Sequence, residues 1–125
     1  MVTEAGQVVD RFLAAWKQAS VDELLDFFTE DAVWHPIPMA PVVGKGALRE
    51  ALAGWLEGAV ALDVEVKQQL SNDTTVMQER TDRFSLGGEE HETPVCAVFE
   101  IDNGRIAAWR EYFDMSPYAG GAEDR

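Results

Sequence analysis

The chain has 125 residues, a length that suits one domain built around a single hydrophobic core, and we expect residues 1–125 to form that domain. Its 23 acidic residues against 10 basic ones give a formal net charge of −13, which disfavours binding to nucleic acid and to anionic membrane surfaces. No apolar stretch approaches the ~20 residues of a membrane-spanning helix. The only cysteine is Cys96, so no disulfide can form within the chain; we predict a cytoplasmic location, with Cys96 buried as a small hydrophobic residue.

The first half of the chain predicts three helices. Apolar side chains recur every three or four residues over residues 3–18, which is typical of an amphipathic helix. Ser20 followed by Glu23 forms a capping box, so a second, short helix begins there and is expected to end near Thr29. A further run of apolar residues at helical spacing predicts a third helix that ends at about Gly58.

Extended segments make up most of the rest. Residues 32–37 look extended, but Pro36 and Pro38 cannot donate hydrogen bonds to a neighbouring strand, so this strand is predicted to be short or to lie at an edge. Farther along the chain the apolar period changes to two, which predicts four long strands over residues 60–70, 74–86, 89–101 and 105–114. The residues that separate them are typical of turns: Ser71-Asn72-Asp73, Gly87-Gly88 and Asp102-Asn103-Gly104.

This order of elements, helices first and an antiparallel meander last, favours an α+β fold. We expect a curved, mostly antiparallel sheet with the three N-terminal helices packed on its concave face. Residues 118–125 carry no such pattern and are expected to form a loose tail.

Three ionisable side chains are candidates for chemistry. Arg80 and Asp82 share one face of the second long strand, because side chains alternate between the two faces of a strand. In the last strand Glu111 shares a face with two large aromatic residues, Trp109 and Phe113, so that face is expected to point inward. Two carboxylates beside one arginine can share a proton, which provides a general acid and a general base together. From the spacing alone, the favoured interpretation is that Arg80 and Asp82 form an ordinary ion pair and that Glu111 is solvated at the end of a strand.

The inward faces also predict a pocket for a neutral, mostly apolar small molecule, although inward aromatic residues are more often simply core. Its predicted lining from this pattern is Phe84, Val95, Trp109 and Phe113. His35 and His91 are interpreted as structural or surface residues. The sequence has no cluster of His, Cys and Asp at metal-ligand spacing and no glycine-rich phosphate loop, so no metal or other cofactor is expected.

The outward face of the last two strands is too apolar for open solvent. It is predicted to carry Cys96, Val98, Ile106, Ala108 and Tyr112. We expect a homodimer to form through this face.

Several runs of residues resemble the limonene-1,2-epoxide hydrolase family over nearly the whole chain. They include Trp34-His35-Pro36-Ile37-Pro38-Met39, Glu79-Arg80-Thr81-Asp82 and Trp109-Arg110-Glu111-Tyr112-Phe113-Asp114. The resemblance implies the cone-shaped SnoaL-like fold, also called the nuclear-transport-factor-like fold. It also implies cofactor-independent opening of a small hydrophobic epoxide to a diol.

The resemblance assigns roles to individual residues. Asp82 matches the acid that protonates the epoxide oxygen, and Arg80 matches the arginine that bridges two carboxylates. Glu111 stands where the family has its water-activating aspartate, one methylene group longer. Trp34 stands at the tyrosine and Pro36 at the asparagine that help to hold the attacking water, and Trp34 is also expected to contact substrate. An indole can only donate a hydrogen bond and a proline side chain offers none, so the water loses much of its support.

Two other functions remain open from the sequence. The same fold hosts isomerases and polyketide cyclases that move a proton with one acidic residue. A small-molecule-binding domain without catalytic activity would also account for the changes at Trp34 and Pro36.

Overall fold

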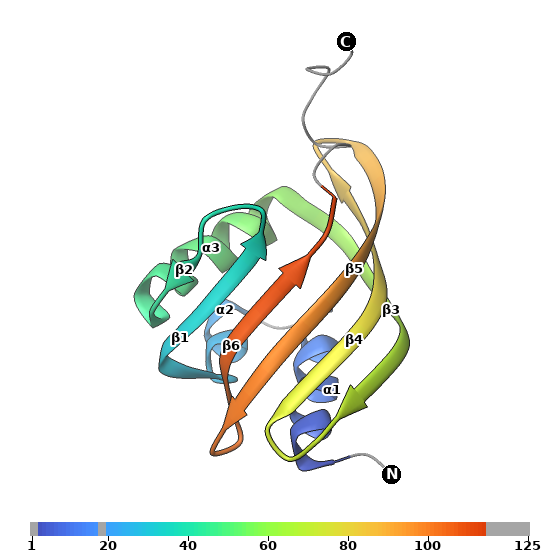
Figure 1. Ribbon diagram of the computed structural model, residues 1–125. Coiled ribbons are helices and arrows are strands. Elements are labelled where there is room, and N and C mark those ends of the chain that lie inside the picture. The colour runs from blue at the N-terminus through green and yellow to red at the C-terminus, as the bar shows by residue number, and fades with distance from the viewer. Residues whose placement is uncertain (1–2, 18–19, 115–125) are drawn as a thin grey trace.

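The computed structural model describes residues 3–17 and 20–114, so the predicted tail at 118–125 lies outside the described residues (Figure 1). Three helices and six strands occupy the described ranges. In chain order they are α1 (Glu4–Ala15), α2 (Val21–Leu25), β1 (Phe28–Ile37), β2 (Val42–Val43), α3 (Lys45–Gly58), β3 (Ala59–Ser71), β4 (Thr75–Leu86), β5 (Glu89–Asp102) and β6 (Arg105–Tyr112). The predicted α+β class and the four long strands are confirmed.

The start of α2 is as predicted, but its end is not. The Ser20 side chain accepts from the backbone N–H of Glu23, and the Glu23 side chain accepts from the backbone N–H of Ser20, which is the expected capping box. The helix ends at Leu25 rather than near Thr29, because Phe28 already pairs with Ile106 of β6. A long-range strand pairing thus replaces the last predicted helical turn.

The sheet has the order β2-β1-β6-β5-β4-β3, and all neighbouring strands are antiparallel except β1 and β6. The prediction of a short or edge strand before α3 was wrong, because β1 has ten residues and lies between β2 and β6. Its one proline, Pro36, is tolerated because β2 pairs only with Val33 and Trp34, so the outer side of β1 has no strand partner at Pro36.

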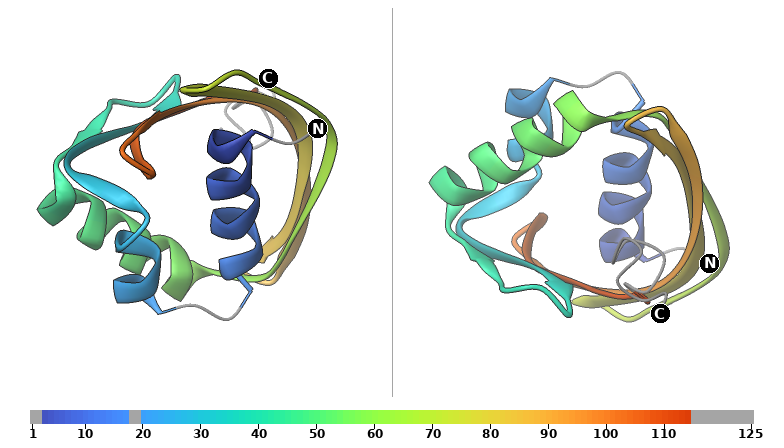
Figure 2. Two further views of the ribbon diagram at one scale, coloured as in Figure 1. Left: turned by 90° about the horizontal axis from the view of Figure 1, so that it is seen from below. Right: turned by 90° about the horizontal axis from the view of Figure 1, so that it is seen from above.

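Figure 2 shows α1 lying inside the curve of the sheet, where it packs against β3 and β4, while α3 packs against β1, β2 and β3. The fully buried Phe12 of α1 makes edge-to-face contacts with Phe28, Phe99 and Trp109 at centroid distances of 5.3, 6.2 and 5.1 Å. Aromatic rings therefore line the concave face where α1 packs against it.

The convex face differs from expectation at two residues. Cys96 lies on the face opposite the helices, as expected, where it pairs with Glu79 and Tyr112, but it is exposed rather than buried. Ile106, expected on this face, is fully buried in the core. The register shifts on both sides of β6 next to Ile106, and such irregularities break the simple alternation of faces.

Among the described residues, no helix has both the length and the apolar character needed to cross a membrane.

Candidate active site

Strand β4 carries the polar residues that face the helices. Gln78 and Arg80 are each only 2% exposed, and Asp82 is half-buried on the same face. Glu79 is exposed on the opposite face. The predicted alternation of this strand is therefore confirmed.

Strand β6 supplies the second carboxylate. Glu111 is 8% exposed, so the interpretation of Glu111 as a solvated strand-end residue was wrong. In the register of the sheet, Ala97 of β5 lies between Gln78 of β4 and Glu111 of β6. The side chain of Ala97 is a single methyl group, so it takes up little space on this face of the sheet. The side chain of Arg80 can therefore extend across β5 to Glu111.

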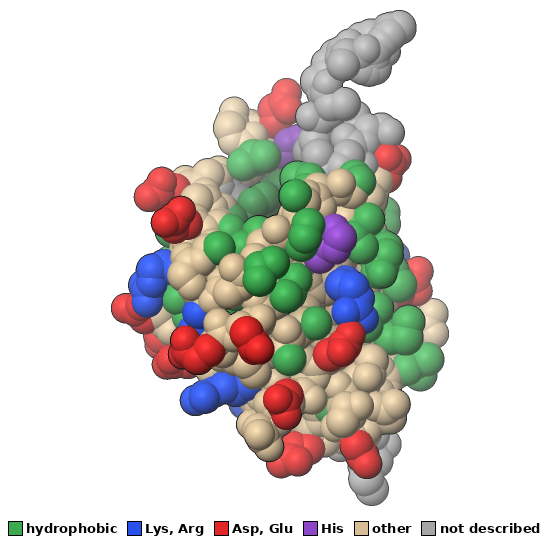
Figure 3. Space-filling view, turned by 60° about the vertical axis from the view of Figure 1, so that its left-hand side comes forward, with side chains coloured by type: hydrophobic (Ala, Val, Ile, Leu, Met, Phe, Trp, Pro, Cys, Tyr) green, Lys and Arg blue, Asp and Glu red, His purple; other side chains and the backbone are tan. Residues whose placement is uncertain are grey.

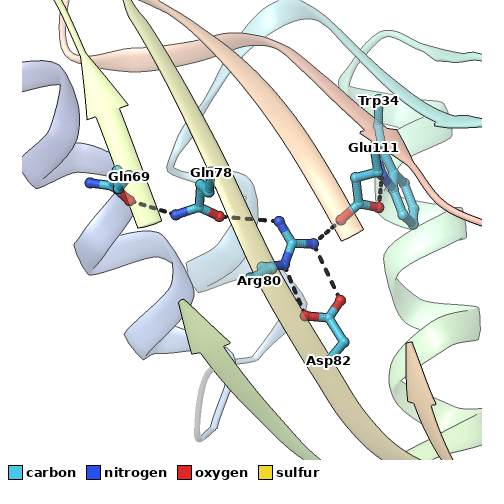
Figure 4. A network of polar contacts seen from close by, with 6 residues as sticks. All are labelled: Trp34, Gln69, Gln78, Arg80, Asp82 and Glu111. Carbon is cyan, nitrogen blue, oxygen red and sulfur yellow. Dashed lines mark hydrogen bonds and ion pairs between the residues drawn. The ribbon is translucent and has the colours of Figure 1, made fainter. Parts of the chain in front are cut away.

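Arg80 is the centre of the polar network (Figure 4). Its Nε donates to Oδ1 of Asp82 at 2.8 Å and its Nη2 to Oδ2 at 3.3 Å, a two-pronged ion pair. The same Nη2 also donates to Oε2 of Glu111, and Nη1 donates to Oε1 of Gln78 at 3.2 Å. All three guanidinium nitrogens are thus engaged, and the two carboxylates lie on either side of one cation.

Trp34 holds the other oxygen of Glu111. Its indole Nε1 donates to Oε1 of Glu111 at 3.2 Å, and its ring stacks on Trp109 at a centroid distance of 4.9 Å and an interplanar angle of 12°. The parallel pairing of β1 with β6 sets this arrangement, because Trp34 pairs with Trp109 and Pro36 with Glu111. The indole of Trp34, which can only donate a hydrogen bond, therefore donates it to the carboxylate of Glu111.

Burial dominates the electrostatics of the site. Removal from water raises the pKa of Glu111; the positive charge of Arg80 opposes this shift, and the nearby Asp82 adds to it. For Arg80, burial acts to lower the pKa, but the charges of Glu111 and Asp82 outweigh it and raise the pKa. The guanidinium consequently stays charged, while Glu111 takes up a proton more readily than an ordinary glutamate.

The network opens into a cavity of about 270 Å³, just below the roughly 300–1,000 Å³ typical of small-molecule pockets. All eight residues proposed from the sequence line it: Trp34, Arg80, Asp82, Phe84, Val95, Trp109, Glu111 and Phe113. Sequence reasoning missed further apolar lining from the helices and from β3, namely Leu13, Trp16, Trp55 and Val64. The sequence shows these residues at helical or strand spacing, but the spacing does not distinguish a residue that lines a pocket from one that is buried in the core.

Two other sequence expectations concern histidine and metal. His35 is not among the residues that line the cavity, and it pairs with Arg110 on β6. Within residues 3–17 and 20–114 no group of three or more His, Cys, Asp or Glu side chains is arranged to hold a metal ion.

The raised pKa of Glu111 predicts a pH-dependent stability. Below the ordinary value of 4.5 the group is neutral in both states; above it the unfolded chain ionises first, whereas ionising Glu111 in the folded chain costs free energy because the group is buried. The free energy of unfolding of wild type, relative to Glu111→Gln, should therefore fall as pH rises from about 4.5. Urea denaturation across this range measures it, with the exposed Glu50→Gln as the reference for removing one carboxylate. A difference that is flat or rises with pH would contradict a raised pKa at Glu111.

Known proteins are similar to this chain in sequence and in fold. The family model for the limonene-1,2-epoxide hydrolase catalytic domain matches residues 3–119. The chain is 32% identical over 107 residues to the epoxide hydrolase EphG of Mycobacterium tuberculosis (strain ATCC 25618 / H37Rv), covering 86% of this chain and 71% of EphG. A solved LEH-like epoxide hydrolase of M. tuberculosis superimposes with a TM-score of 0.79 at 28% identity, over 90% of this chain and 84% of that one.

The fold reaches beyond these close relatives. The epoxide hydrolase/cyclase-like enzyme SalBIII superimposes with a TM-score of 0.81 at 16% identity, over 90% of this chain and 92% of SalBIII. At that identity the likeness shows the fold alone, which is the SnoaL-like cone. The family match and the identity to EphG both extend over most of the sequence, and they show that this chain belongs to the limonene-1,2-epoxide hydrolase family.

Proposed function

We propose that residues 1–125 act as one domain that opens a small hydrophobic epoxide to a diol in one step, without a cofactor. The observation that carries the proposal is a buried arginine bonded to two carboxylates, Asp82 and Glu111, at the wall of an apolar cavity. Membership of the epoxide hydrolase family supports the same reaction.

The two carboxylates take different roles in this mechanism. Glu111, ionised, removes a proton from a water molecule as the water oxygen attacks one epoxide carbon. The carbon–oxygen bond of the epoxide breaks, and protonated Asp82 gives its proton to the departing oxygen. The product is the diol, with Glu111 now protonated and Asp82 ionised. Passing one proton back from Glu111 to Asp82 restores the starting state.

Arg80 makes this division of roles possible. One cation between two carboxylates is electrically balanced when the carboxylates hold one proton between them. Before and after the chemical step the trio has the same charge, so no net charge is created in the apolar cavity. The raised pKa of Glu111 also makes its carboxylate a stronger base, which favours removal of a proton from the attacking water.

Glu111 is oriented by donors on both of its oxygens, Trp34 on Oε1 and Arg80 on Oε2. This arrangement fixes the plane of a side chain that is longer than the aspartate implied by the family resemblance. Pro36, whose position pairs with Glu111 and which lines the cavity, offers the water no side-chain hydrogen bond. In our proposal the water is therefore held chiefly by Glu111 itself.

The lining of the cavity supports the proposed class of substrate. Its lining is mostly aromatic and aliphatic, and its only charged side chains are Arg80, Asp82 and Glu111, so far as the described residues show. Such a site favours a compact, uncharged molecule whose single polar atom, the epoxide oxygen, meets Asp82.

A proton-transfer enzyme acting on an enolisable ketone is the second candidate. The observation that favours it is the loss of two water-holding side chains, since Trp34 is bonded to Glu111 and Pro36 has no donor. A buried glutamate with a raised pKa could then serve as the only base. Exchange of ketone hydrogens with deuterated water, with no diol from any epoxide, would select this function.

The convex face of the sheet supports a homodimer, which we propose as the assembly of this protein. Hydrophobic side chains gather over this side of the molecule in Figure 3, and Tyr112 is 46% exposed there. Among the charged side chains of this face, Arg110 is paired with Glu100 at 2.6 Å, and the exposed Glu79 accepts a hydrogen bond from Gln68. Because the chain carries a net charge of −13, a second copy can approach with least repulsion at a face where apolar side chains gather and a charge such as Glu100 is paired. A reducing, cytoplasmic compartment remains part of the proposal, since Cys96 is an exposed free thiol.

The central prediction concerns Asp82. Purified protein should convert small apolar epoxides to diols, and Asp82→Asn should lower kcat roughly 100- to 10,000-fold because the proton donor is lost. Asp73→Asn, at an exposed position between β3 and β4, is the control and should keep wild-type turnover. In ¹⁸O-labelled water the first turnover should label the diol, as direct attack of water requires. Equal rates in wild type and Asp82→Asn would refute the assignment.

A second prediction concerns Trp34. Its hydrogen bond stabilises the Glu111 carboxylate and lowers the pKa of that group, so Trp34→Phe should raise this pKa. The acidic limb of the plot of kcat/KM against pH should then move to higher pH, with a lower kcat. Trp55→Phe makes the same change to another ring of the cavity, one packed edge-on to Phe84, and should alter KM without moving the limb. Identical pH profiles for both variants would argue against the role of Trp34.

The dimer is tested at Val98, which is half-buried on the convex face. Val98→Glu places a charge at the proposed contact and should convert a dimer into a monomer in light scattering. Ala47→Glu adds the same charge at an exposed position of α3 and should leave the dimer intact. A monomeric wild type at micromolar concentration would exclude this assembly.

A further inference from the structure

We propose that Gln78 is a positioning residue, which keeps the Arg80 guanidinium in one place while the proton moves between the two carboxylates. The inference rests on the proposed function, because it concerns the same site. Gln78 was not a candidate from the sequence, and it does not line the cavity. Its side chain is nevertheless only 2% exposed and lies directly against the catalytic arginine.

A chain of side-chain amides leads from Arg80 to the surface of α1 (Figure 4 shows its inner part). Nη1 of Arg80 donates to Oε1 of Gln78 at 3.2 Å, and Nε2 of Gln78 donates to Oε1 of Gln69 at 2.6 Å. Nε2 of Gln69 then donates to Oδ1 of Asp10 at 3.2 Å. Gln69 and Gln78 are direct cross-strand partners on β3 and β4, so the backbone register holds the two amides together.

The two ends of this chain determine the direction of every bond in it. Arg80 can only donate, so the amide oxygen of Gln78 must face it, and the amide nitrogen of Gln78 must face Gln69. At the far end the carboxylate of Asp10 can only accept, so it takes the nitrogen of Gln69. Each amide therefore has one satisfactory orientation, and the partly negative oxygen of Gln78 is held against the cation.

Arg80 needs such a fixed contact because its other partners change charge during the reaction. Its Nη2 is shared between Asp82 and Glu111, and the stronger attraction passes from one to the other as the proton moves. A guanidinium held only by these two groups would follow the negative charge. Gln78 does not ionise, so its hold on Nη1 is the same before and after the step. A displacement of about 1 Å at a reacting site costs roughly 100-fold in rate.

The first experiment compares two glutamine variants. Gln78→Met keeps the length of the side chain and removes both hydrogen bonds; kcat for epoxide opening should fall roughly 10- to 100-fold with little change in KM. Gln68→Met is the matched control, because Gln68 lies on the same strand as Gln69 but is exposed and bonded to Glu79. Equal kcat values for the two variants would overturn the proposal.

A second readout does not depend on epoxide turnover. The indole N–H of Trp34 donates to Glu111, so its NMR resonance should report the protonation of that carboxylate. The groups that face Glu111 are Arg80 and Asp82 from β4 and Trp34 from β1. In Gln78→Met, Arg80 is free to lean toward Asp82, and the titration midpoint should move to higher pH. A midpoint equal to that of Gln68→Met would count against Gln78 even if no epoxide is hydrolysed.

Gln69 provides a milder variant in case Gln78→Met unfolds. Gln69 is half-buried, so Gln69→Met should fold while freeing the amide nitrogen of Gln78. It should shift the Trp34 titration in the same direction by a smaller amount. The double variant should behave like Gln78→Met alone, because both residues act through one contact to Arg80. Independent, additive effects of the two changes, or no shift in Gln69→Met, would show that the amides do not act as one chain.

Discussion

The buried guanidinium of Arg80 is the constraint on which this site depends. A charge that is only 2% exposed is tolerable in an apolar interior only when it is paired and hydrogen-bonded, and here every nitrogen has a partner. Asp82 and Glu111 supply the opposite charge, but two ionised carboxylates would leave an excess of one negative charge. In the proposed mechanism a single shared proton removes that excess. The need to balance a buried charge therefore produces the acid and the base that the proposed reaction uses.

The fold satisfies this requirement through strands that are far apart in the sequence. Arg80 and Asp82 come from β4 and Glu111 from β6, with the small Ala97 of β5 between them. The parallel pairing of β1 with β6 adds Trp34, which donates to Glu111. Helix α1 packs inside the curve of the sheet and so keeps water away from these groups (Figure 2). Exclusion of water raises the pKa of Glu111 and strengthens each ion pair in the site.

The polar network consists of two carboxylates that ionise and two glutamines that do not. Asp82 and Glu111 face the cavity and exchange a proton with substrate and water in the proposed mechanism. Gln78 and Gln69 face away from it and keep one hydrogen-bonding state throughout. Such a division lets the reacting groups change charge without moving the arginine that both depend on.

The sequence by itself determined which side chains share a face. Alternation along β4 and β6 put Arg80 with Asp82, and Glu111 with Trp109, because a strand has a period of two wherever it is regular. The capping box at Ser20 and the turn at Asn103-Gly104, where both residues have positive φ, are likewise local features that the sequence predicts. The α+β class followed from these patterns, and the family resemblance identified the cone fold.

Only the tertiary structure decided how those faces meet. The end of α2, the interior position of β1 and the burial of Ile106 all depend on the pairing of β1 with β6, whose partners are more than 70 residues apart. The bond from Trp34 to Glu111 and the contact of Gln78 with Gln69 depend on register in the same way. Register is set by bulges and by the packing of the whole sheet, so no local period in the sequence contains it.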